Sequence, residues 1–362
     1  MNIGIEAKRI FNNNTGLGVY GRNLLKGLAS NQKISNIYLY SPSNKLNIDY
    51  NQNNIIYIYP KYFFKFFKSI WRSIFLGLFI SKKVNVFHGI SGELPFFIPK
   101  NIKKVVTIHD VLFMRFPDDF SFWDRWIHFY KFKRAAQISD QIITVSEASS
   151  EDIQKYFKIP PNKIHVIPNA FSFNRNENEP KKYIEKLPYV VCISSYLSRK
   201  NQLQIVNIFL ETAQQHELNL VLVGKRKGEY FKKVKEVVLN SNFAHRVIFK
   251  ENLKDTEISD LYQNACFAVY PSLYEGFGLP ILEALVNHCP VLVNDFKAAR
   301  EISEDLPVFF DTNDFLDLKE KWFWMIENYQ FQREKIQKNV DKLIEDFSIE
   351  QVVSKTIEVY QK

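Results

Sequence analysis

The amino-acid sequence predicts an α/β protein of two Rossmann-like, doubly wound domains, and three observations support this prediction. First, the chain has 362 residues, which at about 150 residues per domain indicates two domains. Second, 46% of the residues are hydrophobic and 24% are charged, as in ordinary globular proteins, so disordered, collagen-like and coiled-coil classes are excluded. Third, short apolar runs alternate with polar loops and helical stretches in both halves, which is typical of parallel sheets covered by helices.

The first half opens with a predicted strand at residues 2–6. A glycine-containing loop at 12–18 follows, and then a helical stretch at 19–28, in which three leucines recur at the spacing of one helix face. Further apolar runs that end in polar or glycine-containing loops predict more strands, at residues 36–40, 84–87, 104–108, 141–145 and 163–167.

The alternation restarts after a polar segment at 173–186, which we interpret as an interdomain linker. The domains are therefore expected at 1–172 and 187–345, with a C-terminal helix in 346–362 that crosses back to the first domain. Two such domains are expected to face each other across a cleft between the carboxyl ends of their strands. Ligands of open α/β sheets bind at these ends. In the second half, strands are expected at residues 189–193, 219–224, 246–249, 266–270 and 290–293.

Charge divides the chain unevenly. Residues 1–170 contain 23 basic and 11 acidic side chains and the remainder 25 and 28, so the net charge of +9 comes from the first half. A basic half attracts phosphorylated ligands, anionic lipid or nucleic acid. Since no nucleic-acid recognition motif or zinc site accompanies the charge, we expect no nucleic-acid partner.

Cysteine usage and hydropathy indicate a cytoplasmic protein. Cys192, Cys266 and Cys289 have neither the number nor the spacing of a disulfide framework or a zinc site, which suits a reducing compartment. The first six residues include an acid where a signal peptide would be apolar. No run of about 18 uncharged apolar residues predicts a membrane span.

The most informative segment is residues 274–285, Tyr-Glu-Gly-Phe-Gly-Leu-Pro-Ile-Leu-Glu-Ala-Leu. Gly276 and Gly278 let the backbone approach a ligand closely, and the proline that follows suits the first turn of a helix. A helix N-terminus behind such a loop offers free N–H groups and the positive end of the helix dipole to a phosphate. Glu275 and Glu283 can accept hydrogen bonds from neighbouring sugar hydroxyls.

This segment resembles the signature of the family 4 retaining glycosyltransferases, which have the GT-B fold. That signature has two glutamates separated by seven residues around a Gly-Phe-Gly-Leu-Pro core, as between Glu275 and Glu283 here. The resemblance extends over nearly the whole chain, because further elements of the family are matched at residues 15–20, 107–110, 144–147, 166–169 and 198–201.

The resemblance implies a nucleotide-sugar donor held mainly by the second domain. Arg199 and Lys200 would bind its diphosphate, and since Ser198 replaces the family's proline, the diphosphate contacts rest on these two cations. Glu275 would hold hydroxyls of the transferred sugar, and Glu283 would hold the ribose. The turn between the two glutamates would support the sugar and the diphosphate through backbone N–H groups, and it contains Gly276, Phe277, Gly278 and Leu279.

The resemblance also assigns roles to the first domain. Gly16 and Gly18 would close over the donor, and His109 would face the sugar near the reacting carbon. His88, which follows a predicted strand, is a weaker candidate for the acceptor side.

The implied chemistry is electrostatic. The family retains the anomeric configuration, and an attack assisted by the leaving phosphate requires no protein base, so none is assigned. The chain contains no Asp-x-Asp triplet, and we expect neither a metal ion nor another cofactor. Glu275→Ala is expected to abolish transfer while folding is unchanged.

Two basic aromatic runs, at residues 62–72 and 122–134, leave two interpretations open. Basic amphipathic helices with Trp and Phe lie in the interface of anionic membranes. This would fit a lipid-linked acceptor, such as a growing O-antigen or capsule chain, and a peripheral position on the inner face of the cytoplasmic membrane. Alternatively, these aromatic side chains pack under the sheet as ordinary helix faces.

The function favoured by the resemblance is that of a bacterial polysaccharide mannosyltransferase that uses GDP-mannose. Two other classes stay open: a nucleotide-sugar epimerase or glycan phosphorylase of similar fold, and a non-catalytic membrane- or glycan-binding protein. No lysine stands in a recognisable pyridoxal-phosphate setting, which disfavours a phosphorylase. An NAD dehydrogenase is disfavoured because no acidic residue ends a second strand about 20 residues after the first glycine loop.

Overall fold

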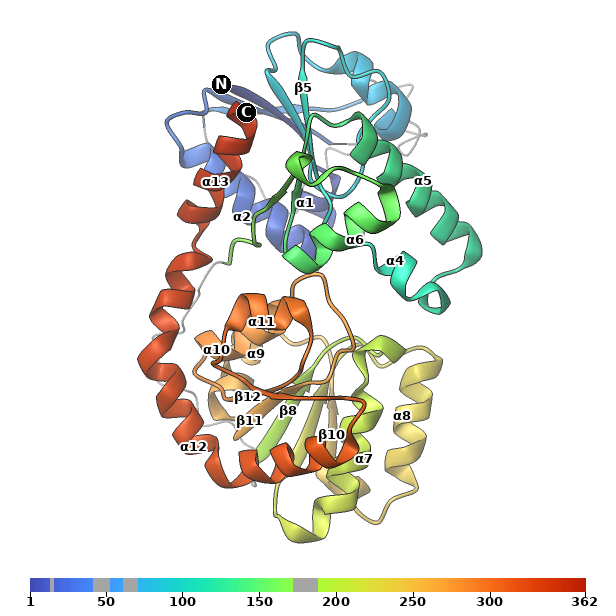
Figure 1. Ribbon diagram of the computed structural model, residues 1–362, viewed down its shortest axis with the longest axis vertical. Coiled ribbons are helices and arrows are strands. Elements are labelled where there is room, and N and C mark those ends of the chain that lie inside the picture. The colour runs from blue at the N-terminus through green and yellow to red at the C-terminus, as the bar shows by residue number, and fades with distance from the viewer. Residues whose placement is uncertain (14–15, 42–52, 61–70, 172–187) are drawn as a thin grey trace. The chain divides into compact units, whose positions relative to one another are not determined.

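The chain divides into two compact units, each with one parallel sheet (Figure 1). The first unit comprises Met1–Ser172 and Asp346–Lys362, and the second comprises Phe173–Glu345. The expected linker at 173–186 falls outside the residues that can be described. The computed structural model describes residues 1–13, 16–41, 53–60, 71–171 and 188–362.

The first unit holds a seven-stranded sheet in the order β3-β2-β1-β4-β5-β6-β7, which confirms the predicted α/β class. The strand order reverses between β1 and β4, the kind of position where doubly wound sheets bind ligands. One strand at the edge of the sheet, β3, was not predicted. The strands are β1 (Asn2–Glu6), β2 (Asn36–Tyr40), β3 (Ile55–Ile58), β4 (Val86–Gly89), β5 (Lys103–Thr107), β6 (Gln141–Thr144) and β7 (Ile164–Val166).

Alternating side chains place a hydrophobic core on each face of this sheet. In β2, Ile37 and Leu39 belong to one core and Tyr38 and Tyr40 to the other, because successive side chains of a strand point to opposite faces. The first core is completed by the helices α1 (Lys8–Asn12), α2 (Gly16–Ser30) and α13 (Ile349–Gln361). The second is completed by α4 (Leu112–Arg115), α5 (Phe122–Ile138) and α6 (Glu147–Phe157).

The predicted glycine loop at 12–18 is wrong in part, because α2 already begins at Gly16 and α1 occupies residues up to Asn12. Gly18 serves close packing rather than an unusual backbone angle. A Cβ added to Gly18 would lie 1.7 Å from the backbone oxygen of Asn13, so only glycine lets α2 start this close to the end of α1.

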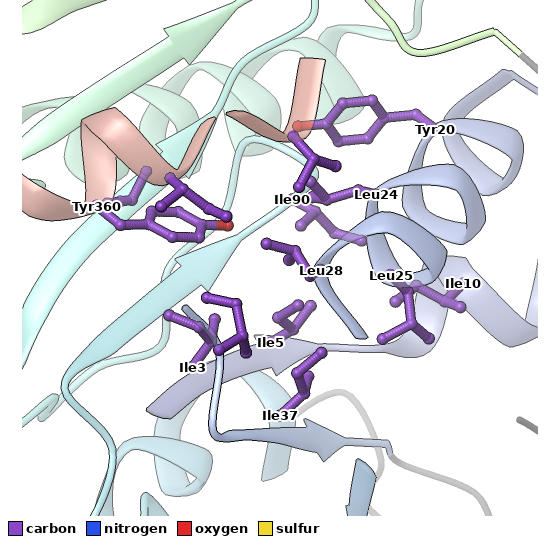
Figure 2. Packing of buried hydrophobic residues seen from close by; sticks show 14 of the residues in the cluster. Ile3, Ile5, Ile10, Tyr20, Leu24, Leu25, Leu28, Ile37, Ile90 and Tyr360 are labelled. Carbon is purple, nitrogen blue, oxygen red and sulfur yellow. The ribbon is translucent and has the colours of Figure 1, made fainter. Parts of the chain in front are cut away.

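The last helix, α13, packs on α2 in the first core, where Tyr360 lies among the buried residues (Figure 2). Buried hydrogen bonds also join α13 to the sheet. A Cβ on Gly27 of α2 would lie 2.5 Å from a valine methyl of α13, so the two helices are in close contact. The Tyr360 hydroxyl lies 2.7 Å from His88 Nδ1, and His88 Nε2 lies 2.7 Å from Thr107 Oγ1. The Tyr20 hydroxyl lies 2.9 Å from the same threonine oxygen. These bonds tie β4, β5, α2 and α13 together.

The second unit holds a six-stranded parallel sheet in the order β10-β9-β8-β11-β12-β13. Here the strand order reverses between β8 and β11. All strands except the three-residue edge strand β13 were predicted from apolar runs. They are β8 (Tyr189–Ile193), β9 (Asn219–Val223), β10 (Val247–Lys250), β11 (Phe267–Tyr270), β12 (Val291–Asn294) and β13 (Val308–Phe310).

Helices cover both faces of this second sheet (Figure 1). On one face, α7 (Gln202–Thr212), α8 (Glu229–Leu239) and α12 (Phe315–Asp346) share a core with alternate residues of β8, β9 and β11. On the other face, α10 (Leu279–Val286) contacts α9 (Asp255–Asn264), α11 (Lys297–Ser303) and the strands β11 and β12. Within the described part of the chain, no helix is both long and apolar enough to cross a membrane.

Tyr360→Phe tests the buried hydrogen bonds of α13. The change leaves a fully buried ring nitrogen of His88 without its partner, and we expect a loss of about 1–3 kcal/mol in the free energy of unfolding, measured by urea unfolding. Tyr130→Phe, on a half-exposed side chain, is the control and should change stability by less than about 0.5 kcal/mol. Equal effects in the two variants would contradict this role of Tyr360.

Candidate functional site

The candidate site of the second unit lies where its strand order reverses. β8 and β11 are neighbours in the sheet, with Phe267 beside Val190 and Ala268 beside Val191. Two chain segments leave the carboxyl ends of these strands, residues 194–201 after β8 and 271–278 after β11. Because parallel neighbours end at the same edge, the sheet brings together segments that are far apart in the sequence.

Two cations and one carboxylate meet at this edge. Arg199 Nη1 lies 3.0 Å from Glu275 Oε1, and Lys200 Nζ forms an ion pair with the same oxygen. The three side chains are only 11–12% exposed. Lys200 also lies 3.4 Å from the Tyr270 hydroxyl and 5.5 Å from the centre of that ring. The sequence predicted all three charged residues for the site, and the structure places them in one cluster, which we call the Arg199–Lys200–Glu275 cluster.

Hydrogen bonds hold the two segments of the cluster in place. The backbone N–H of Leu273 donates to the carbonyl oxygen of Arg199 (2.8 Å), which joins the segments directly. The Ser272 hydroxyl donates to Glu275 Oε1 (2.9 Å), and Asn294 Nδ2 donates to the Ser272 carbonyl oxygen (2.8 Å). Sequence analysis missed Ser272 and Asn294. The spacing of Ser272 three residues before Glu275, directly after a strand, is the signal that could have identified it.

The cluster carries one net positive charge in a place that water reaches poorly. Burial lowers the pKa of Lys200, although the Glu275 carboxylate acts in the opposite direction. Removing one partner from a buried group of charges leaves the others uncompensated. The expectation that Glu275→Ala leaves folding unchanged therefore does not fit this geometry, because the carboxylate neutralises two buried cations.

The turn before α10 has the backbone form that the motif predicted. Gly278 has a φ of +107° and precedes the helix, and a proline occupies its first turn. A side chain at Gly278 would be strained at this angle, and its Cβ would lie 3.1 Å from a methyl group of Ile302. The segment Gly276, Phe277, Gly278 and Leu279 thus leads the backbone into the N-terminus of α10, beside the cluster that contains Glu275. Helix N-termini of this kind attract anions.

Glu283 lies within α10 in a different environment from Glu275. Its side chain is partly buried, and burial raises its pKa from 4.5 to about 7, with a further contribution from the Asp255 carboxylate. The charged group that acts on Glu283 is therefore the Asp255 carboxylate, whereas Glu275 is paired with two cations. The structure joins Glu275 to the two cations and places Glu283 outside that ion cluster.

His109 follows β5 in the first unit and is held as a neutral imidazole. Its Nε2 lies 3.1 Å from the Ile90 carbonyl oxygen, so this nitrogen carries the proton and donates it, and Nδ1 is the acceptor. Burial lowers the pKa of His109 to about 4. The Tyr20 ring packs edge-on against it at 4.6 Å, and the Ser149 hydroxyl donates to its backbone oxygen at 2.8 Å. A hydroxyl group could therefore donate to His109, but His109 is not an acid at neutral pH.

Two other candidates of the first unit differ from their expected settings. Gly16 and Gly18 lie in the first turn of α2, not in a loop. The assignment of His88 to the acceptor side is wrong, because its ring is fully buried and both ring nitrogens are hydrogen-bonded within the core. Burial lowers the pKa of His88 to about 3, so its role is structural.

Comparisons with known families match both units. A family model described as "Glycosyltransferase Family 4" matches residues 14–175, and one described as "Glycosyl transferases group 1" matches residues 174–343. Together the two models cover residues 14–343.

Curated relatives match only part of the chain. An O-antigen chain mannosyltransferase, RfbU, of Salmonella typhimurium is 26% identical over 235 residues, which are 64% of this chain and 62% of that protein. An MMP alpha-(1->4)-mannosyltransferase of Mycolicibacterium hassiacum is 28% identical over 181 residues, 49% of this chain and 43% of that protein. The chain thus spans less than two thirds of the length of these relatives.

Solved structures match almost the whole chain. A glycosyltransferase from Rickettsia africae has a TM-score of 0.74 at 17% identity and covers 99% of this chain and 97% of its own. WaaG, a glycosyltransferase involved in lipopolysaccharide biosynthesis, has a TM-score of 0.73 at 14% identity and covers 99% of both chains. At these identities the likeness shows the fold.

Glu275→Gln tests the pairing within the cluster. The loss of one charge from a buried ion cluster should lower the free energy of unfolding by about 3 kcal/mol, measured by urea unfolding. Inorganic pyrophosphate should recover more stability in this variant than in the wild type, because an anion takes the place of the carboxylate. Glu304→Gln, which removes one partner of an exposed ion pair with Lys342, is the matched control and should cost less than about 1 kcal/mol. An unchanged stability of Glu275→Gln would contradict the pairing.

Glu283→Gln tests the environment of the second glutamate. Since the pKa of Glu283 rises from 4.5 to about 7 on folding, the wild type loses stability as the pH rises between these values, because the carboxyl ionises in the unfolded chain but stays protonated in the folded one. Glutamine cannot ionise, so its gain over the wild type should be small at pH 4.5 and grow to at most about 3 kcal/mol at pH 8. Unfolding in guanidinium at the two pH values measures this difference. A stability difference between Glu283→Gln and the wild type that does not change with pH would refute it.

Proposed function

We propose that this chain, which belongs to family 4 of the GT-B glycosyltransferases, moves mannose from GDP-mannose to a growing, lipid-linked cell-surface glycan with retention of configuration. The observation that carries the proposal is the Arg199–Lys200–Glu275 cluster at the reversal of the second sheet. Two poorly solvated cations beside a helix N-terminus match the charge of a diphosphate.

Donor binding would exchange the partners of the cluster. The fork of Arg199 can bind two oxygens of the diphosphate, and the ammonium group of Lys200 can act as a compact charge. As the diphosphate takes up these cations, Glu275 becomes free to accept hydrogen bonds from hydroxyls of the transferred sugar. The ribose hydroxyls would bind Glu283, and because this requires its carboxylate, donor affinity should increase as the pH rises through about 7.

The reaction would be accelerated by preorganised positive charge that stabilises the leaving group. The bond between the anomeric carbon and the diphosphate oxygen breaks, and negative charge grows on the leaving diphosphate. Arg199, Lys200 and the N-terminus of α10, at Gly276, Phe277, Gly278 and Leu279, would stabilise this charge without a metal ion or another cofactor. The acceptor oxygen bonds to the anomeric carbon on the same face, and its proton passes to the leaving phosphate oxygen, so no protein base is needed.

From the first unit, we propose that His109 and the start of α2 contribute to the reaction. His109 Nδ1 would accept a hydrogen bond from a sugar hydroxyl, since its Nε2 proton is already donated to Ile90. Gly16 and Gly18 would contact the donor from the first turn of α2, in which Gly16 is exposed and Gly18 is buried beside Asn13. In this account His109 orients the sugar and transfers no proton.

The sugar and the acceptor are proposed from the relatives and from the charge of the sequence. The names of the mannosyltransferase relatives support mannose, and the basic first half of the sequence supports an anionic, lipid-linked acceptor at the inner face of the cytoplasmic membrane. A nucleotide-sugar epimerase and a non-catalytic glycan-binding protein are the alternatives. An epimerase would release a free altered sugar or sugar nucleotide without an acceptor, and a binding protein would show no turnover.

Thermal-shift measurements with a panel of nucleoside diphosphates and nucleotide sugars, each with and without EDTA, test the donor site. GDP and GDP-mannose should stabilise the protein, by about 2.7 kcal/mol at a hundred times the dissociation constant, and EDTA should not change this. Arg199→Ala or Lys200→Ala should weaken binding at least tenfold, since a hydrogen bond to a charged group contributes about 1.5–3 kcal/mol. Lys232→Ala, on an exposed side chain of α8, should bind as the wild type does.

The outcomes separate the parts of the proposal. Stabilisation by UDP or ADP rather than GDP would keep the glycosyltransferase assignment and refute GDP-mannose. Binding that disappears with EDTA would refute metal independence. An inverted anomeric centre in the product, determined by nuclear magnetic resonance, would refute retention.

A further inference from the structure

Helix α5 of the first unit has one face that packs and one that does not. On the packed face, Phe132 contacts Phe113 at a ring distance of 5.4 Å, and Phe129 contacts Phe157 at 5.9 Å. A Cβ on Gly92 would lie 2.4 Å from the Phe132 ring, so this aromatic side chain is fitted closely into the unit. For this face, the interpretation that the aromatic run at 122–134 packs as an ordinary helix face is confirmed.

The other face of α5 is apolar and exposed. Large side chains recur at three- to four-residue spacing, which places them along one side of the helix. Two pairs stabilise one another: Trp126 stacks on Tyr130 at 6.0 Å, and Phe122 meets Trp123 edge-on at 5.5 Å. The exposed fractions are 42–70%, for Phe122, Trp123, Trp126, Ile127 and Tyr130. We call these five residues the outer face of α5.

The outer face has the size of the apolar patches that often mark binding sites. Four of its residues are aromatic and each has roughly 200 Å² of surface, so their exposed parts together amount to roughly 500 Å². The largest apolar patch of a typical monomer measures about 300–600 Å² and often marks a binding site. All of this area comes from two turns of one helix, so a partner would meet a continuous row of rings.

Cations border the outer face. Arg125 flanks it, and Lys133 continues the row three residues after Tyr130. Arg134 lies 3.6 Å above the Phe96 ring and donates to the Leu94 carbonyl oxygen, beside the end of the row. The acid of this helix, Asp124, accepts a hydrogen bond from Ser121 Oγ at 2.7 Å. With four cations and one acid among residues 122–138, the helix carries a net charge of +3.

We infer that the outer face of α5 binds the surface of a membrane that contains anionic lipid. Trp and Tyr combine an apolar ring with one polar group and favour the boundary between acyl chains and headgroups. Cations beside them add attraction to anionic headgroups. A second copy of the chain fits less well, because a two-fold contact would set Arg125 and Lys133 against the same cations of the other copy.

The inference deepens the proposed function, because it rests on the proposed lipid-linked acceptor for its biological use. An enzyme bound to the bilayer through α5 would encounter a lipid-linked acceptor by diffusion along the membrane surface rather than through bulk solution. The second basic run of the sequence, 62–72, does not enter the inference, because residues 61–70 lie outside the described residues.

Flotation with vesicles tests the inference on the full chain without donor or acceptor. The probes are vesicles of phosphatidylcholine with and without phosphatidylglycerol. The wild type should float with the anionic vesicles, and the double variant Trp123→Ser, Trp126→Ser should bind them at least tenfold more weakly, because two large rings no longer leave water. Arg125→Gln and Lys133→Gln should each weaken this binding about fivefold, the factor given by about 1 kcal/mol per cation. The matched control is Trp324→Ser, Phe331→Ser, which removes two exposed rings of α12.

Three outcomes would overturn the inference: flotation of the tryptophan variant equal to that of the wild type, equal loss in the α12 control, and no flotation of the wild type. A wild-type dimer that the tryptophan variant converts to a monomer, seen by analytical ultracentrifugation in the absence of vesicles, would show that the face contacts a second copy. Thermal unfolding of each variant at the wild-type temperature excludes loss of folding. The flotation experiment contains no substrate. A failure to float would therefore not affect the assignment of the donor site, and a failure to bind GDP would not affect the result of flotation.

Discussion

The second unit depends on one electrostatic constraint: two cations and one carboxylate are buried together where the strand order of its sheet reverses. Buried charges are costly unless they are paired, so Arg199 and Lys200 determine where Glu275 lies, and a backbone hydrogen bond from Leu273 to Arg199 joins the two segments that carry them. A diphosphate would supply the negative charge that allows Glu275 to leave the cations and turn to a sugar. Stability and donor binding at this edge therefore depend on the same charges.

Burial also determines which groups can take part in proton transfer. His88 and His109 both have a lowered pKa, and each is neutral at physiological pH. Because Nε2 of His109 donates its proton to the Ile90 carbonyl oxygen, the remaining ring nitrogen, Nδ1, can only accept a hydrogen bond. Glu283, by contrast, has its pKa raised to about 7, so its charge changes within the physiological range. A mechanism in which neither histidine acts as an acid fits the lowered pKa values of His88 and His109.

The sequence allowed the fold class and most strands to be predicted, because buried parallel strands appear as short, nearly continuous apolar runs. The edge strands β3 and β13 were missed, and their length alone does not explain this, because the three-residue edge strand β7 was predicted. Gly18 was assigned to a loop because glycine usually marks one, whereas here it permits close helix packing. Arg199 and Glu275 were identified from motifs. Their contact could not be predicted, because they are 76 residues apart in the sequence and meet only because β8 and β11 are adjacent strands. The exposed side of α5 could not be separated from its packed side, because aromatic residues occupy both.

A crystal structure of this protein with a bound nucleoside diphosphate tests most directly whether the diphosphate takes over the cations of the Arg199–Lys200–Glu275 cluster. We expect the phosphate oxygens to lie within hydrogen-bond distance of Arg199 and Lys200, at the N-terminus of α10, and Glu275 to have lost at least one of its two cationic partners. A diphosphate bound elsewhere, for example at the basic loop Lys225, Arg226 and Lys227 after β9, with the Arg199–Lys200–Glu275 cluster unchanged, would contradict it.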